Sequence, residues 1–153
     1  MKRNLISILT LSLVIAGCGS DGGSNPLEGR FIDDPVRGLT YTCTGGGKAD
    51  NTGKTSATGG FSYFDGQTCT FKIGNVTLGA AVKVGTDSVI TPQDVAGVSR
   101  AATDAPSALA IAQFLQSFND GSASGSLVIP DEVHTQLANV AAAEYKHRPG
   151  LIA

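Results

Sequence analysis

Alternation of apolar and small polar residues in the middle of the chain is the feature that most limits how it folds. From Leu39 to Thr44, every second residue is Leu, Tyr or Cys, and the residues between them are all Thr. The same pattern returns from Thr68 to Ile73, where Cys, Phe and Ile alternate with Thr and Lys. A repeat of two residues predicts strands with one buried face and one solvated face.

Further strands are predicted on both sides of this pattern. Phe61 and Tyr63 share one face, and the run from Val76 to Val84 also alternates. Glycine-rich turns are predicted at residues 58–60, 64–67 and 73–76, and the second of them has the Asp-Gly pair of a hairpin. These short strands predict an antiparallel sheet or small sandwich over residues 31–90.

Two cysteines lie in these strands, and both belong to the apolar face. Cys43 follows Leu39 and Tyr41 at intervals of two, and Cys69 leads an equivalent series. In an oxidising compartment, inward cysteines on neighbouring strands are candidates for a disulfide. We predict a bond between Cys43 and Cys69, which would stabilise the fold by roughly 3–4 kcal/mol. The alternative is a pair of reduced, buried thiols.

The first 18 residues have the organisation of an export signal. Lys2 and Arg3 precede an apolar run from Leu5 to Ala16, which is shorter than the roughly 20 residues needed to span a bilayer. The run ends in Ala16-Gly17-Cys18. Together these features resemble the signal peptide and lipobox of a bacterial lipoprotein. The alternative is an ordinary secretory signal with an incidental cysteine.

The lipoprotein resemblance implies an anchor and a location. The signal peptide, residues 1–17, would be removed and acyl chains attached to Cys18, so that the lipid bilayer becomes a partner. Gly19 at the next position resembles the pattern sorted to the outer membrane of Gram-negative bacteria. Residues 18–30 are rich in Gly, Ser and Asp and are predicted to form a flexible tether, with an ordered strand as the alternative.

The β region also has a family resemblance, over residues 35–80. Its strand rhythm is carried by residues 36–43, 58–63, 66–74 and 78–79. It resembles a module of proteobacterial lipoproteins and the prealbumin-type sandwich of carboxypeptidase-regulatory-like domains. The resemblance implies a scaffold or binding unit, although Cys69 stands where that rhythm has an aliphatic residue.

The last third of the chain, residues 91–148, is predicted to be helical. Helix starts are indicated at Thr91-Pro92, at Asp104-Ala105-Pro106 and at Pro130-Asp131. The expected ends are near residue 99, at Phe118 and before Pro149. The fold class is therefore α+β, with a small antiparallel β-sheet or sandwich followed by two or three helices.

Charge and composition exclude several classes of function. The formal net charge is −2, and removal of Lys2 and Arg3 leaves nine basic against 13 acidic residues, so we expect no nucleic-acid partner. Gly53-Lys54-Thr55-Ser56 lacks the spacing of a phosphate-binding loop, so residues 45–60 are expected to form an exposed loop with Lys54 solvated. With two His and three Cys we predict no metal site. A calcium loop at Asp120, resembling an acid-rich loop of related lipoproteins, is a minor alternative.

Catalytic groups are sparse in this sequence. His134 is expected on a solvated helix face, and the pairs Asp33-Asp34 and Asp131-Glu132 lie at a turn and a helix start. We predict no catalytic residue and no cofactor. The predicted function is an envelope lipoprotein that acts as a non-catalytic binding or assembly module for an envelope protein. The alternatives are a truncated N-terminal module of a larger surface protein and an envelope hydrolase.

Overall fold

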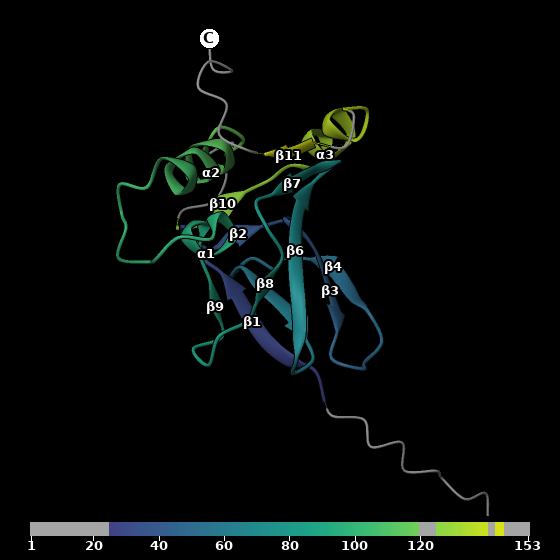
Figure 1. The fold of residues 1–153 in the computed structure, drawn as a ribbon. Coiled ribbons are helices and arrows are strands. Elements are labelled where there is room, and N and C mark those ends of the chain that lie inside the picture. The colour runs from purple at the N-terminus through teal and green to yellow at the C-terminus, as the bar shows by residue number, and fades with distance from the viewer. Residues whose placement is uncertain (1–24, 120–124, 141–142, 146–153) are drawn as a thin grey trace, which may run out of the picture.

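The computed structural model describes residues 25–119, 125–140 and 143–145 (Figure 1). Most strands precede the helices, so the predicted α+β class is confirmed. The strands are β1 (Leu27–Phe31), β2 (Val36–Arg37), β3 (Thr40–Gly45), β4 (Asn51–Lys54), β5 (Gly60–Tyr63), β6 (Gln67–Ile73), β7 (Val76–Leu78), β8 (Val82–Lys83), β9 (Val89–Ile90), β10 (Leu127–Val128) and β11 (Ala143–Tyr145). The helices are α1 (Pro92–Ala96), α2 (Pro106–Gln116) and α3 (Asp131–Ala138).

The larger sheet contains six strands, in the order β11-β7-β6-β3-β4, with β8 also paired to β6. Its central strands β3 and β6 are antiparallel and place Tyr41 opposite Phe71. Burial alternates along both strands, because their apolar residues face the core and their Thr residues face away. The predicted alternation is confirmed, and Ile73 pairs with Val76 across the predicted tight turn between β6 and β7.

The smaller sheet has the order β5-β1-β9 and corrects the predicted tether. The tether is expected to reach residue 30, but β1 already begins at Leu27 and pairs antiparallel with β5. Gly29 makes this possible, since a Cβ atom there would lie 2.5 Å from the ring of Phe61. The glycine that suggested a flexible tether instead allows the ring to pack directly on the backbone of β1.

Aromatic rings join the two sheets into a sandwich. The ring centroid of Phe71, from the larger sheet, lies 4.9 Å from Phe31 and 5.2 Å from Phe61 of the smaller one. Both contacts are edge-to-face, the arrangement that the ring quadrupole favours. The backbone N–H of Ser62 also donates to the hydroxyl of Tyr41, 3.3 Å away, which links the sheets by a polar contact.

Three connections in the β region differ from the prediction. The turn at residues 64–67 is not a hairpin, because it joins β5 and β6, which belong to different sheets. The predicted exposed loop at residues 45–60 contains β4, which pairs with β3. The predicted strand from Val76 to Val84 breaks after Leu78, because Gly79 has a φ of +57° and packs against the backbone of Val95.

The first two helices form where predicted but are shorter. α1 begins with a capping box between Thr91 and Asp94 and ends at Ala96, because Gly97 adopts a left-handed conformation. α2 ends at Gln116 rather than at Phe118. Its residues Ala108, Ala110, Ile111 and Leu115 are buried, so one apolar face of the helix packs into the core.

The third helix is much shorter than predicted, and the region is not wholly helical. α3 ends at Ala138, and residues 143–145 form β11, which runs parallel to β7. The side-chain amide of Asn75 donates to the carbonyl of Ala138 at 2.5 Å and to that of Val140 at 3.2 Å. These bonds satisfy carbonyls at the end of α3. β10 also pairs with β2, so the last third contributes strands to the fold.

Candidate functional site

The predicted anchor lies outside the described residues. Cys18, the predicted signal peptide and the predicted tether up to residue 24 belong to this part of the chain, as does Asp120. Within residues 25–119, 125–140 and 143–145, no helix is long and apolar enough to cross a bilayer. Lipidation of Cys18 and calcium binding at Asp120 stay predictions.

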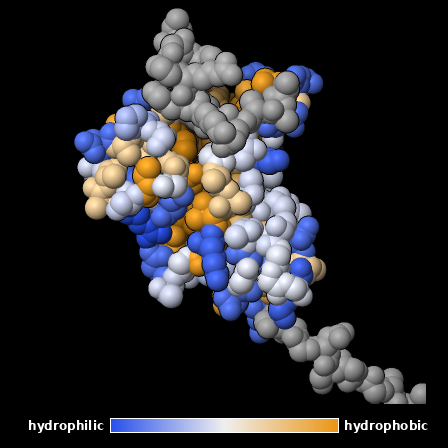
Figure 2. Space-filling view, viewed as in Figure 1, coloured by the Kyte–Doolittle hydropathy of each residue, from blue (hydrophilic) through white to orange (hydrophobic). Residues whose placement is uncertain are grey.

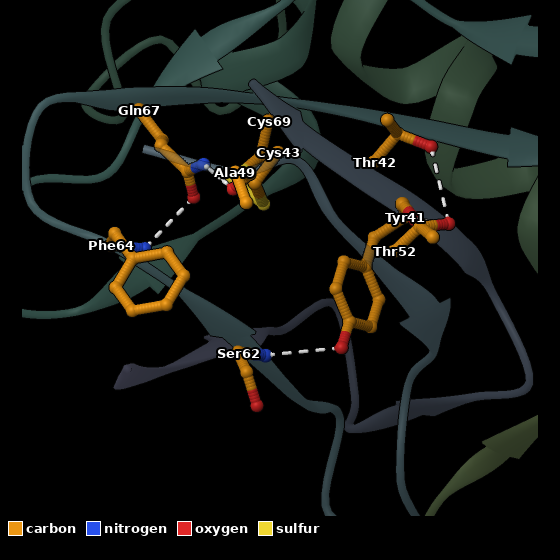
Figure 3. The surroundings of a disulfide bond; sticks show 9 residues. All are labelled: Tyr41, Thr42, Cys43, Ala49, Thr52, Ser62, Phe64, Gln67 and Cys69. Carbon is orange, nitrogen blue, oxygen red and sulfur yellow. Dashed lines mark hydrogen bonds between the residues drawn. A yellow bond between two sulfur atoms is a disulfide. The ribbon is translucent and has the colours of Figure 1, made fainter. Parts of the chain in front are cut away.

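Cys43 and Cys69 are joined in the centre of the larger sheet (Figure 3). They face each other on β3 and β6, and their sulfur atoms lie 2.07 Å apart. Both side chains are fully buried, with an exposed fraction of 0%. The distance is that of a disulfide bond and agrees with the predicted pair. Its burial gives the bond a structural place in the core.

Gln67 holds two loops together beside this bond (Figure 3). Its side chain is 1% exposed, and its amide nitrogen donates to the carbonyl of Ala49 at 2.9 Å. Its amide oxygen accepts from the backbone N–H of Phe64 at 2.8 Å. Sequence reasoning placed Gln67 in a turn and missed this role, because the Ala49 partner lies in a separate loop.

His134 is not on a solvated face, contrary to the prediction, but links α3 to two turns of the sheet. Its Nε2 atom lies 2.7 Å from the carbonyl oxygen of Gly38, and its Nδ1 accepts from the N–H of Gly74 at 3.2 Å. Because a carbonyl only accepts, Nε2 carries the proton and the ring is neutral. Burial is the largest effect and lowers the pKa of His134, and the charge of Lys54 lowers it further. The hydrogen bond to Gly38 and the charge of Asp131 raise it, but the pKa stays below its ordinary value.

The carboxylate pairs occupy the structural places predicted for them. Asp33 and Asp34 lie in a turn. Burial raises the pKa of Asp33, and the charge of Asp34 raises it further, whereas the hydrogen bond from Gln116 lowers it without cancelling the rise. Asp131 begins α3 and forms an ion pair with Lys54 at 2.5 Å, so Lys54 is not simply solvated. Among the described residues, no group of three His, Cys, Asp or Glu residues is placed to hold a metal ion.

The outer face of the larger sheet is its most regular polar surface. The outward residues of β3, β4, β6 and β8 are all Thr or Lys, and we call this surface the threonine–lysine face: Thr40, Thr42, Thr44, Thr52, Lys54, Thr68, Thr70, Lys72 and Lys83. Figure 2 shows mostly white to blue surface over β3, β4 and β6. The alternation of Thr was visible in the sequence, but the neighbouring strands that align the residues in rows were not.

A shallow pocket of about 400 Å³ lies at the end of the sandwich where β1 begins. Leu27, Tyr63 and Lys83 are among the residues that line it. The hydroxyl of Tyr63 is 3.4 Å from that of Ser88, and Gln67 already uses both ends of its amide. No described, buried side-chain nitrogen or oxygen lacks a hydrogen-bond partner, so this pocket offers no unpaired buried polar group to a ligand.

Comparison with protein-family models, curated proteins and solved structures found no match. The resemblance to lipoproteins and to carboxypeptidase-regulatory-like domains therefore stays a prediction.

Proposed function

We propose that the protein is a lipid-anchored lipoprotein of the bacterial envelope, where it acts as a non-catalytic binding or assembly module. The observation that carries the proposal is the presence in one chain of the Ala16-Gly17-Cys18 signal and a buried Cys43–Cys69 bond. An export signal and a disulfide both belong to an oxidising compartment. The two features are independent, because the signal precedes the folded body and the bond lies in its core.

The position of β1 supports a body held close to the membrane. Eight residues separate Cys18 from Leu27, where β1 begins. A chain of that length spans at most about 30 Å, at roughly 3.5 Å for each residue. A short tether confines a binder to the membrane surface and so raises its local concentration near other envelope components. A surface of modest affinity is therefore sufficient for function.

The partners of the titratable groups support a binding role over a hydrolytic one. Both ring nitrogens of His134 contact backbone atoms, and the carboxylate of Asp131 faces Lys54. A general base needs a free nitrogen or oxygen within reach of a substrate proton. Here these groups hold α3 against the sheet, whereas the threonine–lysine face is partly to fully exposed across four strands.

Metabolic labelling with a palmitate analogue tests the anchor. We expect the natural protein and a matched Ser20→Ala variant to be labelled and to fractionate with membranes. Cys18→Ala should be unlabelled and should leave the membrane fraction, because the proposed acyl chains supply the attachment. Mass spectrometry should find a mature chain that begins with modified Cys18. An unprocessed Met1, or membrane fractionation of Cys18→Ala equal to that of the natural protein, would contradict the proposal.

A further inference from the structure

The threonine–lysine face combines regular spacing with a single sign of charge. Residues two apart on a strand lie about 7 Å apart, and neighbouring strands about 4.8 Å apart, so the Thr hydroxyls form a grid. The Thr42 and Thr52 hydroxyls lie 3.5 Å from each other, and that of Thr52 also donates to the carbonyl of Tyr41. Within the described part of the chain, the side chains of Thr68 and Thr70 have no protein partner, which leaves their hydroxyls available to a ligand.

The charge of this face opposes that of the rest of the protein. The whole chain has a formal charge of −2, yet β3, β4, β6, β7 and β8 contain no Asp or Glu. The edge strand β11 has Glu144 in its sequence. Lys54 is paired with Asp131, while Lys72 and Lys83 are exposed and have no ion-pair partner among the described residues. Positive charge is thus concentrated on a surface that an anionic ligand complements.

The separation of the two lysines favours a polymer over a small anion. Lys83 pairs with Thr68, which lies four residues before Lys72 on β6. Four residues of strand and one strand spacing put the two Cα atoms about 14 Å apart. A single phosphate or carboxylate is too small to contact both lysines, whereas a chain with repeated acidic groups is long enough.

The chemistry of the face favours a polysaccharide over a nucleic acid. A Thr hydroxyl donates and accepts, as do the hydroxyls of sugars. Single-stranded nucleic acid is usually bound by stacking on aromatic side chains. The aromatic residues of β3 and β6, Tyr41 and Phe71, are buried on the opposite face of the sheet. We propose that the threonine–lysine face binds an anionic polysaccharide, with Lys72 and Lys83 contacting its acidic groups. This inference rests on the proposed role of the protein as a binding module.

Binding of the purified full chain to immobilised polygalacturonate tests this inference. Neutral dextran, single-stranded RNA and vesicles containing phosphatidylglycerol serve as comparison ligands. With two lysine contacts and a counterion slope of about 0.7 for each, affinity should fall about sevenfold between about 50 mM and about 200 mM salt. Lys72→Glu/Lys83→Glu should weaken binding at least tenfold and remove this salt dependence.

Arg30→Glu is the control, because it makes the same kind of charge reversal on β1 of the smaller sheet, on the other side of the sandwich from the face. It should retain binding within about twofold, since screening limits the effect of charges beyond about 10 Å. Thr42→Val/Thr70→Val keeps the branched shape and should weaken binding by loss of hydroxyl contacts. Equal losses in the lysine and arginine variants, a stronger preference for RNA or vesicles, or no binding to polygalacturonate would overturn the inference. The palmitate experiment is independent, so an anchored protein without polysaccharide binding would leave the proposed lipoprotein intact.

Discussion

Removal of the Cys43–Cys69 bond should cost a large part of the stability of this fold. The two residues are 26 apart in sequence, and the chain-entropy relation for a loop of that size gives about 3.5 kcal/mol at 25 °C. Small domains have a total stability of about 5–15 kcal/mol, so the loss should be prominent. Cys43→Ala/Cys69→Ala should lose this amount and a further increment, because both side chains are fully buried and Ala leaves space behind.

Urea unfolding of three forms separates the bond from the packing. The natural protein, its reduced form and the double alanine variant are compared by linear extrapolation. The difference between oxidised and reduced protein isolates the bond, since the sulfur atoms remain in the core of both. At roughly 4 °C for each kcal/mol, the thermal midpoint should fall by about 14 °C on reduction. A loss below about 1 kcal/mol, with the bond verified by mass in the natural protein, would refute the reasoning.

Two further predictions concern α3 and the break after β7. The pKa of His134 is lowered in the folded state, so the unfolded chain binds a proton first, and stability should be full above about pH 6.5 and fall as the pH drops toward the folded pKa. Unfolding midpoints measured across about pH 5–8 would reveal this slope, and His134→Asn should remove it. An unchanged slope in this variant would contradict a neutral ring. Gly79→Ala should lower the free energy of unfolding by more than about 2 kcal/mol. The new Cβ would lie 2.0 Å from the carbonyl oxygen of Val95, and the positive φ adds a further cost. Gly97→Ala, with a similar φ and no atom within 4 Å of its Cβ, is the control and should lose only about 1 kcal/mol; equal losses in thermal unfolding would contradict the role of the close contact.

The correct predictions of strand faces and of the start of α1 follow from local sequence patterns. The inward position of Cys43 and Cys69 follows from the period of two alone, because successive side chains on a strand point to opposite faces. The start of α1 also follows from local chemistry, since Thr91 and Asp94 cap it from within three residues. Such features were predictable because each depends only on a few neighbouring residues.

The wrong predictions share one physical cause: the residues concerned interact with partners that are distant in the sequence. The sequence predicts a loop at residues 51–54 because they contain Gly and polar residues, but β3 supplies backbone hydrogen bonds that make them a strand. The sequence predicts a solvated His134 because its partners, Gly38 and Gly74, lie far from it in the sequence. Gly29 suggested flexibility, although the ring of Phe61 needs the space that a missing side chain leaves.

By itself, the sequence determined which residues face inward and where the helices begin, because these depend on side-chain period and local chemistry. Tertiary structure alone decided which strands are neighbours, where α3 ends and how separate Thr and Lys residues become one surface. Strand pairing joins backbone groups that are distant in sequence, and its register is chosen by the packing of the whole core.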